Sequence, residues 1–184
     1  MNKTLLTTAL IAGLSVAAVA NAATPVSSGT ITINGTVVAS TCSVSINGGT
    51  ASPTIQLSPV VNTMLTAVGS ATGWQPVSIA LSGCTAMSGF TTVFPYFTGT
   101  NIDTSSGYLK NTGSATGVEI ALSNGQSTTN ALTLQNGSNA QNAGTQLLSA
   151  TTPTFSYYAG YVATAIPVGA GGVTTTVQYN LNYQ

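Results

Sequence analysis

The chain has 184 residues, a mass of 18.3 kDa and only four charged residues, Lys3, Asp103, Lys110 and Glu119. Nucleic-acid binders need clustered Lys and Arg, and zinc or catalytic-triad sites usually need histidine, which is absent, so these classes are largely excluded. Because 43% of the residues are hydrophobic, the chain can bury the core of one domain, and its polar surface must come from Thr, Ser, Asn and Gln.

The first 22 residues have the three parts of a secretory signal peptide. Lys3 supplies the positive start, residues 5–20 form an apolar run, and Ala20, Asn21 and Ala22 make a small-x-small cleavage site. The apolar run contains Thr, Gly and Ser and is shorter than the ~20 residues that a membrane span needs. We therefore predict cleavage after Ala22, export, and no stable membrane span afterwards.

The two cysteines, Cys42 and Cys84, both follow the predicted cleavage site. In an exported chain an even number of cysteines predicts a disulfide, here one that stabilises the fold by about 4 kcal/mol in the loop-entropy model. A redox-active pair or a metal site is the alternative, but there is no CxxC spacing and no histidine to complete a ligand set. No metal or other cofactor is expected.

The rest of the chain alternates apolar and polar residues with period two, which predicts strands rather than helices. The expected strands are 30–38, 42–47, 53–58, 76–82, 90–98, 107–111, 116–122, 131–135, 155–166 and 173–183. Turns with positive φ are expected at Asn47-Gly48, Asn124-Gly125 and Asn136-Gly137, and residues 169–172 would connect the last two strands as a hairpin.

The predicted fold class is all-β, an antiparallel sandwich of the immunoglobulin-like kind in size and number of strands. Residues 136–152 form an irregular loop in this prediction, and there is no internal repeat or second domain.

The two most regular segments lie at opposite ends of the chain. At the C-terminus Val177, Tyr179, Leu181 and Tyr183 alternate with polar residues, and near the N-terminus the segment 30–37 alternates in the same way just before Cys42. These segments are either the last and first strands of a closed sandwich, or an exposed strand and a free arm that pair with other chains. The spacing does not decide between these alternatives.

Several motifs, taken in order, resemble the shaft pilins of chaperone-usher pili, close to type 1 fimbrial major subunits. The motifs cover nearly the whole mature chain and comprise residues 29–38, 40–44, 81–84, 109–111 with 115–122, 158–161 running to 170–173, and the terminal Tyr-x-Leu-x-Tyr. One departure is Gly160, where many members of the family carry a basic residue, so a charged contact between subunits is in doubt.

The resemblance implies an incomplete immunoglobulin-like fold that lacks its last strand and is completed by a donor strand from a partner. The inserting residues would be Gly29, Ile31, Ile33, Gly35 and Val37. The acceptor groove, which first pairs with a periplasmic chaperone, would be formed by Val177, Tyr179, Leu181 and Tyr183, with the Gln184 carboxylate as an anchor for a basic chaperone residue. An outer-membrane usher would then let the arm of the next pilin replace the chaperone.

This interpretation divides the chain into a signal peptide at 1–22, a donor arm at 23–38 and a pilin body at 39–184. The Cys42–Cys84 bond would fix the point where the arm leaves the body. The single domain and the arm favour a shaft subunit of an extracellular fimbrium, supporting surface adhesion, over a tip adhesin.

Two other classes of function are alternatives to a pilin. An enzyme would have to use Asp103 and Glu119 as paired carboxylates, or a Ser with Lys110, and neither set lies in a motif that indicates catalysis, so no catalytic residue is assigned. A secreted adhesive or carbohydrate-binding sandwich is the stronger alternative, because its aromatic residues could form a stacking platform. They are Trp74, Tyr96, Tyr108, Tyr157 and Tyr158.

Overall fold

The computed structural model describes residues 32, 42–84, 89–149 and 152–184. All of its strands lie in the second of two compact units, Ala39–Gln184. The predicted signal peptide lies outside the described residues, as does the expected strand at 30–38 apart from the exposed Thr32. The organisation into signal peptide, arm and body therefore stays a prediction.

The described part of the chain is almost entirely β-structure with two short 3-10 helices, as the alternation predicts. In chain order the elements are β1 (Ser43–Ile46), η1 (Asn62–Met64), β2 (Ala71–Ser82), β3 (Thr92–Thr98), β4 (Leu109–Lys110), β5 (Val118–Ser123), η2 (Thr128–Asn130), β6 (Gln146–Leu147), β7 (Thr154–Ala163) and β8 (Gln178–Tyr183).

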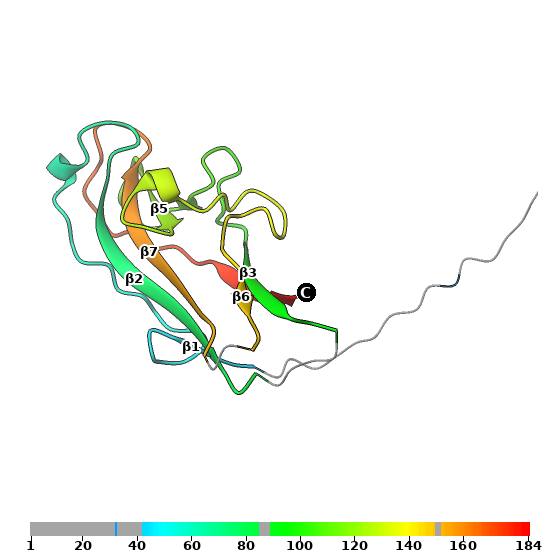
Figure 1. Ribbon diagram of the computed structural model, residues 1–184. Helices are drawn as coiled ribbons and strands as arrows, with labels where there is room; N and C mark the ends of the chain where they lie inside the picture. The colour runs from blue at the N-terminus through cyan, green and yellow to red at the C-terminus, as the bar shows by residue number, and fades with distance from the viewer. Residues whose placement is uncertain (1–31, 33–41, 85–88, 150–151) are drawn as a thin grey trace, which may run out of the picture. The chain divides into compact units, whose positions relative to one another are not determined.

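The strands form two sheets in which every pair is antiparallel (Figure 1). One sheet has the order β1-β2-β7-β5-β4 and the other the order β6-β3-β8. The main core contains Ile79 and Leu81 of β2, Val93 and Phe97 of β3, and Phe155 of β7, all buried. Inward residues of both sheets thus share one core, which confirms an immunoglobulin-like sandwich.

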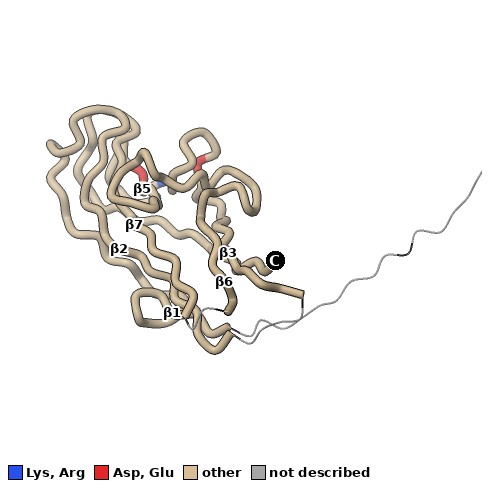
Figure 2. The backbone as a smooth tube through the Cα atoms, viewed as in Figure 1, with Lys and Arg blue, Asp and Glu red and all other residues tan. Residues whose placement is uncertain are grey.

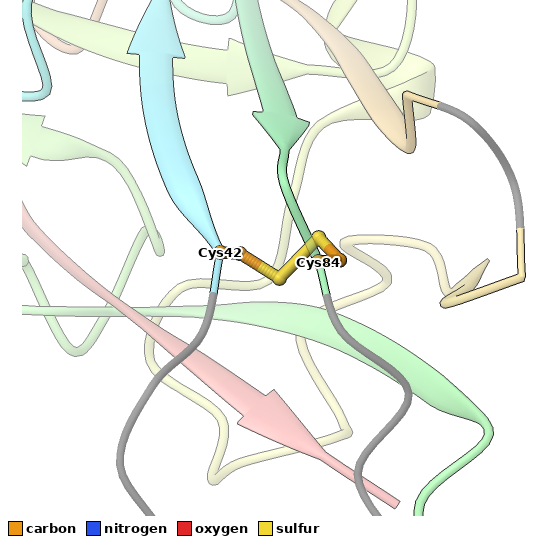
Figure 3. Close-up of a disulfide and its surroundings, with 2 residues drawn as sticks. All are labelled: Cys42 and Cys84. Carbon is orange, nitrogen blue, oxygen red and sulfur yellow. A yellow bond between two sulfur atoms is a disulfide. The ribbon is translucent and has the colours of Figure 1, made fainter.

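The predicted disulfide is present and closes the end of the β1–β2 ladder (Figure 3). Cys42 directly precedes β1 and Cys84 follows β2, with their Cα atoms 4.2 Å apart. The neighbouring pair in the ladder is Ser43 with Ser82. The bond therefore fixes the start of the body to the long strand β2, which also pairs with β7.

Three of the expected strands are wrong in whole or in part, because alternation reports burial and not pairing. Residues 53–58 have no regular secondary structure and pair with no strand in the described chain. Residues 131–135 make a single bridge, from Ala131 to Ser123. The last strand begins at Gln178 rather than at 173, because side chains of Asn111 and Asn101 take the place of a partner strand for residues 174–176.

The expected hairpin at 169–172 is also wrong, because β7 and β8 belong to different sheets and residues 164–177 cross between them. Asn47-Gly48 has positive φ as predicted, but in the later loops the positive φ falls on Asn139 and Asn142 instead of Gly125 or Gly137. The loop at 136–152 contains the short strand β6.

Strand β2 begins five positions earlier than expected, because a bulge between Thr72 and Gln75 breaks the alternation. Gly73 lies in this bulge with φ +70°, and a Cβ atom there would lie 2.7 Å from the Tyr161 ring. Only glycine fits both the backbone conformation and the space.

A buried amide joins β3 to the loop that precedes β6. Gln141 is 2% exposed, its Oε1 accepts from the Phe97 amide at 2.8 Å, and its Nε2 donates to the carbonyls of Phe97 and Leu134 at 2.7 and 2.8 Å. The side chain therefore bonds to backbone groups of β3 that lie beyond the two residues paired with β6.

Replacing Gln141 with Leu should lower the free energy of unfolding by about 2–4 kcal/mol, because the buried groups of Phe97 and Leu134 lose their partner. Urea unfolding measures the change. The same substitution at the exposed Gln126 is the control and should change stability by less than about 0.5 kcal/mol. Equal changes in the free energy of unfolding at the two positions would contradict a stabilising role for the Gln141 hydrogen bonds.

Candidate functional site

The edge of β8 that faces away from β3 pairs with no strand in the described part of the chain. Thr92 and Gln184 exchange both backbone hydrogen bonds, at 2.9 and 3.0 Å, so the even-numbered residues of β8 bond toward β3. In an antiparallel ladder the odd-numbered residues then direct their N–H and C=O groups to the other side. Val177, Tyr179 and Leu181 thus present backbone groups at an open edge.

The residues expected to form the acceptor groove lie along this edge. Tyr179, Leu181 and Tyr183 are in β8, and Val177 directly precedes it. All four are half-buried and pack against the main core. The C-terminal residue lies at the end of the same strand, where Gln184 O accepts from the amides of Thr91 and Thr92 at 2.6 and 2.9 Å.

A second unpaired segment, residues 53–58, accompanies the open edge. Ile55 and Leu57 are half-buried and pack against the main core, whereas Thr54, Gln56 and Ser58 are exposed. Residues 51–60 form no backbone-to-backbone hydrogen bond with any described residue. The sequence alone predicts an ordinary strand here. The local signal of this segment is a short alternating stretch bounded by Pro53 and Pro59.

Two hydrogen bonds hold the unpaired segments near each other. The Tyr179 hydroxyl donates to the Ala51 carbonyl at 2.9 Å, and the Asn62 amide donates to the Val168 carbonyl at 2.9 Å. Between these two hydrogen bonds lie residues 51–62 on one side and residues 168–179 on the other. Each stretch could span up to about 36 Å at ~3.3 Å per residue, and the two run in opposite directions.

One buried polar atom beside the open edge lacks a partner. The Thr175 hydroxyl is buried and makes no hydrogen bond, the only such side-chain atom found among the described residues. Its residue lies two positions before Val177, on the same alternating face. A buried hydroxyl without a partner costs free energy, so this position favours an additional hydrogen-bonding group.

Asp103 and Glu119 both accept hydrogen bonds from neighbouring serines. Asp103 Oδ1 accepts from the Ser105 amide and hydroxyl at 2.7 and 2.5 Å, and Glu119 Oε2 accepts from the Ser106 hydroxyl at 2.8 Å. Lys110 Nζ lies 4.0 Å from Asp103 Oδ2. Each carboxylate is thus held by neighbouring hydroxyls, and in the described ranges no cluster of three or more His, Cys, Asp or Glu could hold a metal.

The five aromatic residues considered for sugar stacking are dispersed. Tyr157 is in the core, edge-to-face with Phe97 at 5.6 Å between ring centroids, and its hydroxyl donates to the Ala143 carbonyl. Tyr96 belongs to β3, whereas Trp74 belongs to the other sheet. None of the five lines the surface hollows of about 220 and 390 Å³. They therefore make no single stacking platform.

Gly160 departs from the usual basic residue for a packing reason. It lies in β7 under the Trp74 side chain, and a Cβ atom there would lie 2.4 Å from the indole ring. A long basic side chain is incompatible with this position of the Trp74 ring.

Comparison with known proteins identifies the family. The model of the fimbrial protein family matches residues 31–184, which include both unpaired segments, β8 and the disulfide. The chain belongs to the fimbrial protein family. This finding confirms the resemblance seen in the sequence and agrees with the all-β, incompletely paired sandwich.

Individual fimbrial proteins show the same similarity. The F17 fimbrial protein of Escherichia coli is 36% identical over 173 residues, which cover 91% of this chain and 94% of that protein. The major fimbrial subunit SMF-1 of Stenotrophomonas maltophilia (strain K279a) is 32% identical, with 84% and 92% covered. Protein FimG of E. coli (strain K12) is 34% identical over 54% of this chain and 55% of that protein.

Fimbriae are structures of the cell surface, so membership of the family implies an extracellular subunit that assembles with other fimbrial proteins. The described residues include no helix with the length and hydrophobicity needed to cross a membrane.

The titratable groups predict a broad plateau of stability between about pH 5 and 9, because the chain has no histidine. Burial raises the pKa of Tyr157, Tyr161 and Tyr179, so stability is lost as the pH rises above about 10, where the unfolded tyrosines ionise. The hydrogen bond from the Ser105 hydroxyl lowers the pKa of Asp103, so its contribution is lost below about pH 4. Melting temperatures measured from pH 3 to 11 test this prediction, and a change in melting temperature near neutral pH would contradict it.

Proposed function

We propose that this chain is the structural subunit of a chaperone-usher fimbria and polymerises by donor-strand exchange. Its N-terminal arm inserts into the acceptor groove of a neighbouring subunit, and its own groove receives the arm of another. The groove lies between the open edge of β8 and the unpaired segment 53–58. Strand addition to an exposed sheet edge is the mode by which pilins are complemented.

The open edge of β8 is the observation that carries the proposal. Backbone groups of Val177, Tyr179 and Leu181 face no described strand, although these residues pack against the core. Unpaired edges of this kind promote aggregation unless something covers them. An incoming strand would pair with these groups, cover the half-buried side chains and give the Thr175 hydroxyl a partner.

The arm has the residues that such an edge requires. Ile31, Ile33 and Val37 form one apolar row, with Gly29 and Gly35 at positions where the arm would pass close to the acceptor backbone. A strand of nine residues reaches about 30 Å at ~3.3 Å per residue. This length is within the upper limit of about 36 Å for the stretch between the two bridging hydrogen bonds.

Assembly requires that the groove be covered before the next subunit arrives. A periplasmic chaperone would lend a strand to the row of Val177, Tyr179, Leu181 and Tyr183, and an outer-membrane usher would exchange that strand for an arm. The Gln184 carboxylate lies at the end of this row, where a basic chaperone residue could contact it. Export through the periplasm follows from the predicted cleavage after Ala22.

The appended-strand experiment tests the groove. Residues 39–184 are compared with the same body carrying a copy of residues 24–38, joined after Gln184 by a flexible linker. Completing the core should turn an aggregating protein into a monomer whose melting temperature is higher by more than about 10 °C. Thermal unfolding and sizing chromatography of the oxidised proteins measure both effects.

The matched control carries Ile31→Asp and Ile33→Asp in the appended copy, and it should behave like the body without an arm. If all three proteins melt alike as monomers, the sandwich is already closed and the adhesive-module alternative becomes the better explanation.

A second experiment uses the unpartnered hydroxyl. Thr175→Val should raise the stability of the 39–184 body by about 1–2 kcal/mol, because it removes a buried group without a partner. In the body with the appended arm the gain should shrink, since the arm backbone supplies that partner. Urea unfolding of the four proteins gives the difference. Thr66→Val, at an exposed position, is the control, and equal gains with and without the arm would argue against contact at Thr175.

A further inference from the structure

The large hydrophobic side chains that remain exposed occupy the two ends of the body. Those with the greatest exposure are Val61 at 62%, Met64 at 54%, Val68 at 67%, Leu147 at 58% and Ile166 at 47%. Four of them, Val61, Met64, Val68 and Ile166, come from two adjoining segments, and we call them the apolar end patch. Leu147 lies elsewhere, in β6.

The two segments of the apolar end patch are tied together twice. The Asn62 amide donates to the Val168 carbonyl at 2.9 Å, and the Gly69 amide donates to the Ala163 carbonyl at 2.8 Å. Figure 1 shows the loop around η1 beside the orange segment that follows β7. No charged residue occurs in 53–70 or 164–184, and the charged positions in Figure 2 lie around β5 and the loop before β4.

Leu147 lies at the opposite end, with the disulfide and the C-terminus. It pairs with Thr92 at the start of β3, and Thr92 pairs with Gln184. The next residue, Leu148, donates to the Thr91 carbonyl at 2.9 Å. The apolar end patch instead lies where β7 ends and β2 begins, since Ala71 pairs with Val162.

This step rests on the proposed function, in which the arm of one subunit lies in the groove of another. The arm then ties the disulfide end of the first subunit to the apolar end patch of the second. All strand pairs of the body are antiparallel, and antiparallel pairing is the more stable kind, so we expect the arm to run antiparallel to β8. The arm then ends near the Asn62–Val168 bridge, beside the apolar end patch. Cys42 follows Val37 by five positions, which span at most about 18 Å.

We propose that the apolar end patch binds the disulfide end of the next copy of this chain, including its Leu147. The contact joins two different surfaces, so it is heterologous and can repeat along a fibre without closing. The two segments of the apolar end patch carry no charged residue, and Leu147 is an exposed apolar side chain at the facing end. Burial of these side chains adds to the donor strand and sets the angle between consecutive subunits. Without this contact the linker of residues 38–41 would be the sole connection outside the groove.

Cross-linking in fibres assembled from the full chain tests the proposal. Met64→Cys and Leu147→Cys are introduced singly and together, the fibres are purified, and a short bismaleimide is added. Denaturing gels report covalent oligomers, and peptide mass spectrometry checks that Cys42–Cys84 remains intact. The double variant should give a ladder of oligomers with at least tenfold more covalent dimer than either single variant.

The matched control pairs Leu147→Cys with Ser156→Cys, an exposed position within β7, and it should give no ladder. A double variant whose fibres form without a ladder overturns the proposal, and so does a yield of covalent dimer from Leu147→Cys alone that equals that of the double variant, which would mean that identical ends meet. If Met64→Cys prevents assembly, Val68→Cys takes its place in the same test. Fibres that still form with Ile31→Asp and Ile33→Asp would instead refute the proposed donor strand.

Discussion

Backbone hydrogen bonding is the constraint on which this structure depends. An antiparallel neighbour satisfies only every second residue of an edge strand, and β8 has one neighbour, β3. The remaining groups of Val177, Tyr179 and Leu181 therefore need a partner that the described body does not supply. The same shortage explains why residues 53–58 pair with no described strand, although half-buried and exposed residues alternate along them as in a strand.

Sequence reasoning could identify the fold class and the disulfide, because these follow from periodicity and from export. The acceptor residues along β8, which were expected from motif order, stay a prediction. Sequence reasoning could not assign partners to strands. Alternation records which side chains face the core. It is the same in 53–58, which pairs with no described strand, as in β8, which pairs with β3. The error at 169–172 has this cause too, since a Gly-rich connection suits a crossover between sheets as well as a hairpin. Bonds that depend on tertiary contact, such as that of Tyr179 with Ala51, leave no local pattern.

Neutral polar groups make most of the side-chain hydrogen bonds of the body, and Lys110 with Asp103, at 4.0 Å, is the one ion pair among the described residues. Gln141 completes the bonding of β3, Asn111 and Asn101 serve residues 174–176, and hydroxyls of Ser105 and Ser106 hold the carboxylates of Asp103 and Glu119. These bonds are short-ranged and do not depend on ionic strength as surface salt bridges do. A surface assembly made from such subunits would keep its internal bonding across changes in external salt.

The disulfide also determines how a fibre would carry tension. A pull on the arm enters the body just before Cys42, and without the bond it would act on β1, whose ladder with β2 has only four pairs. The covalent link passes the load to Cys84 just after β2, the strand that lies between β1 and β7. Force then spreads over the long β2–β7 ladder in shear, and the short first strand is protected from peeling away.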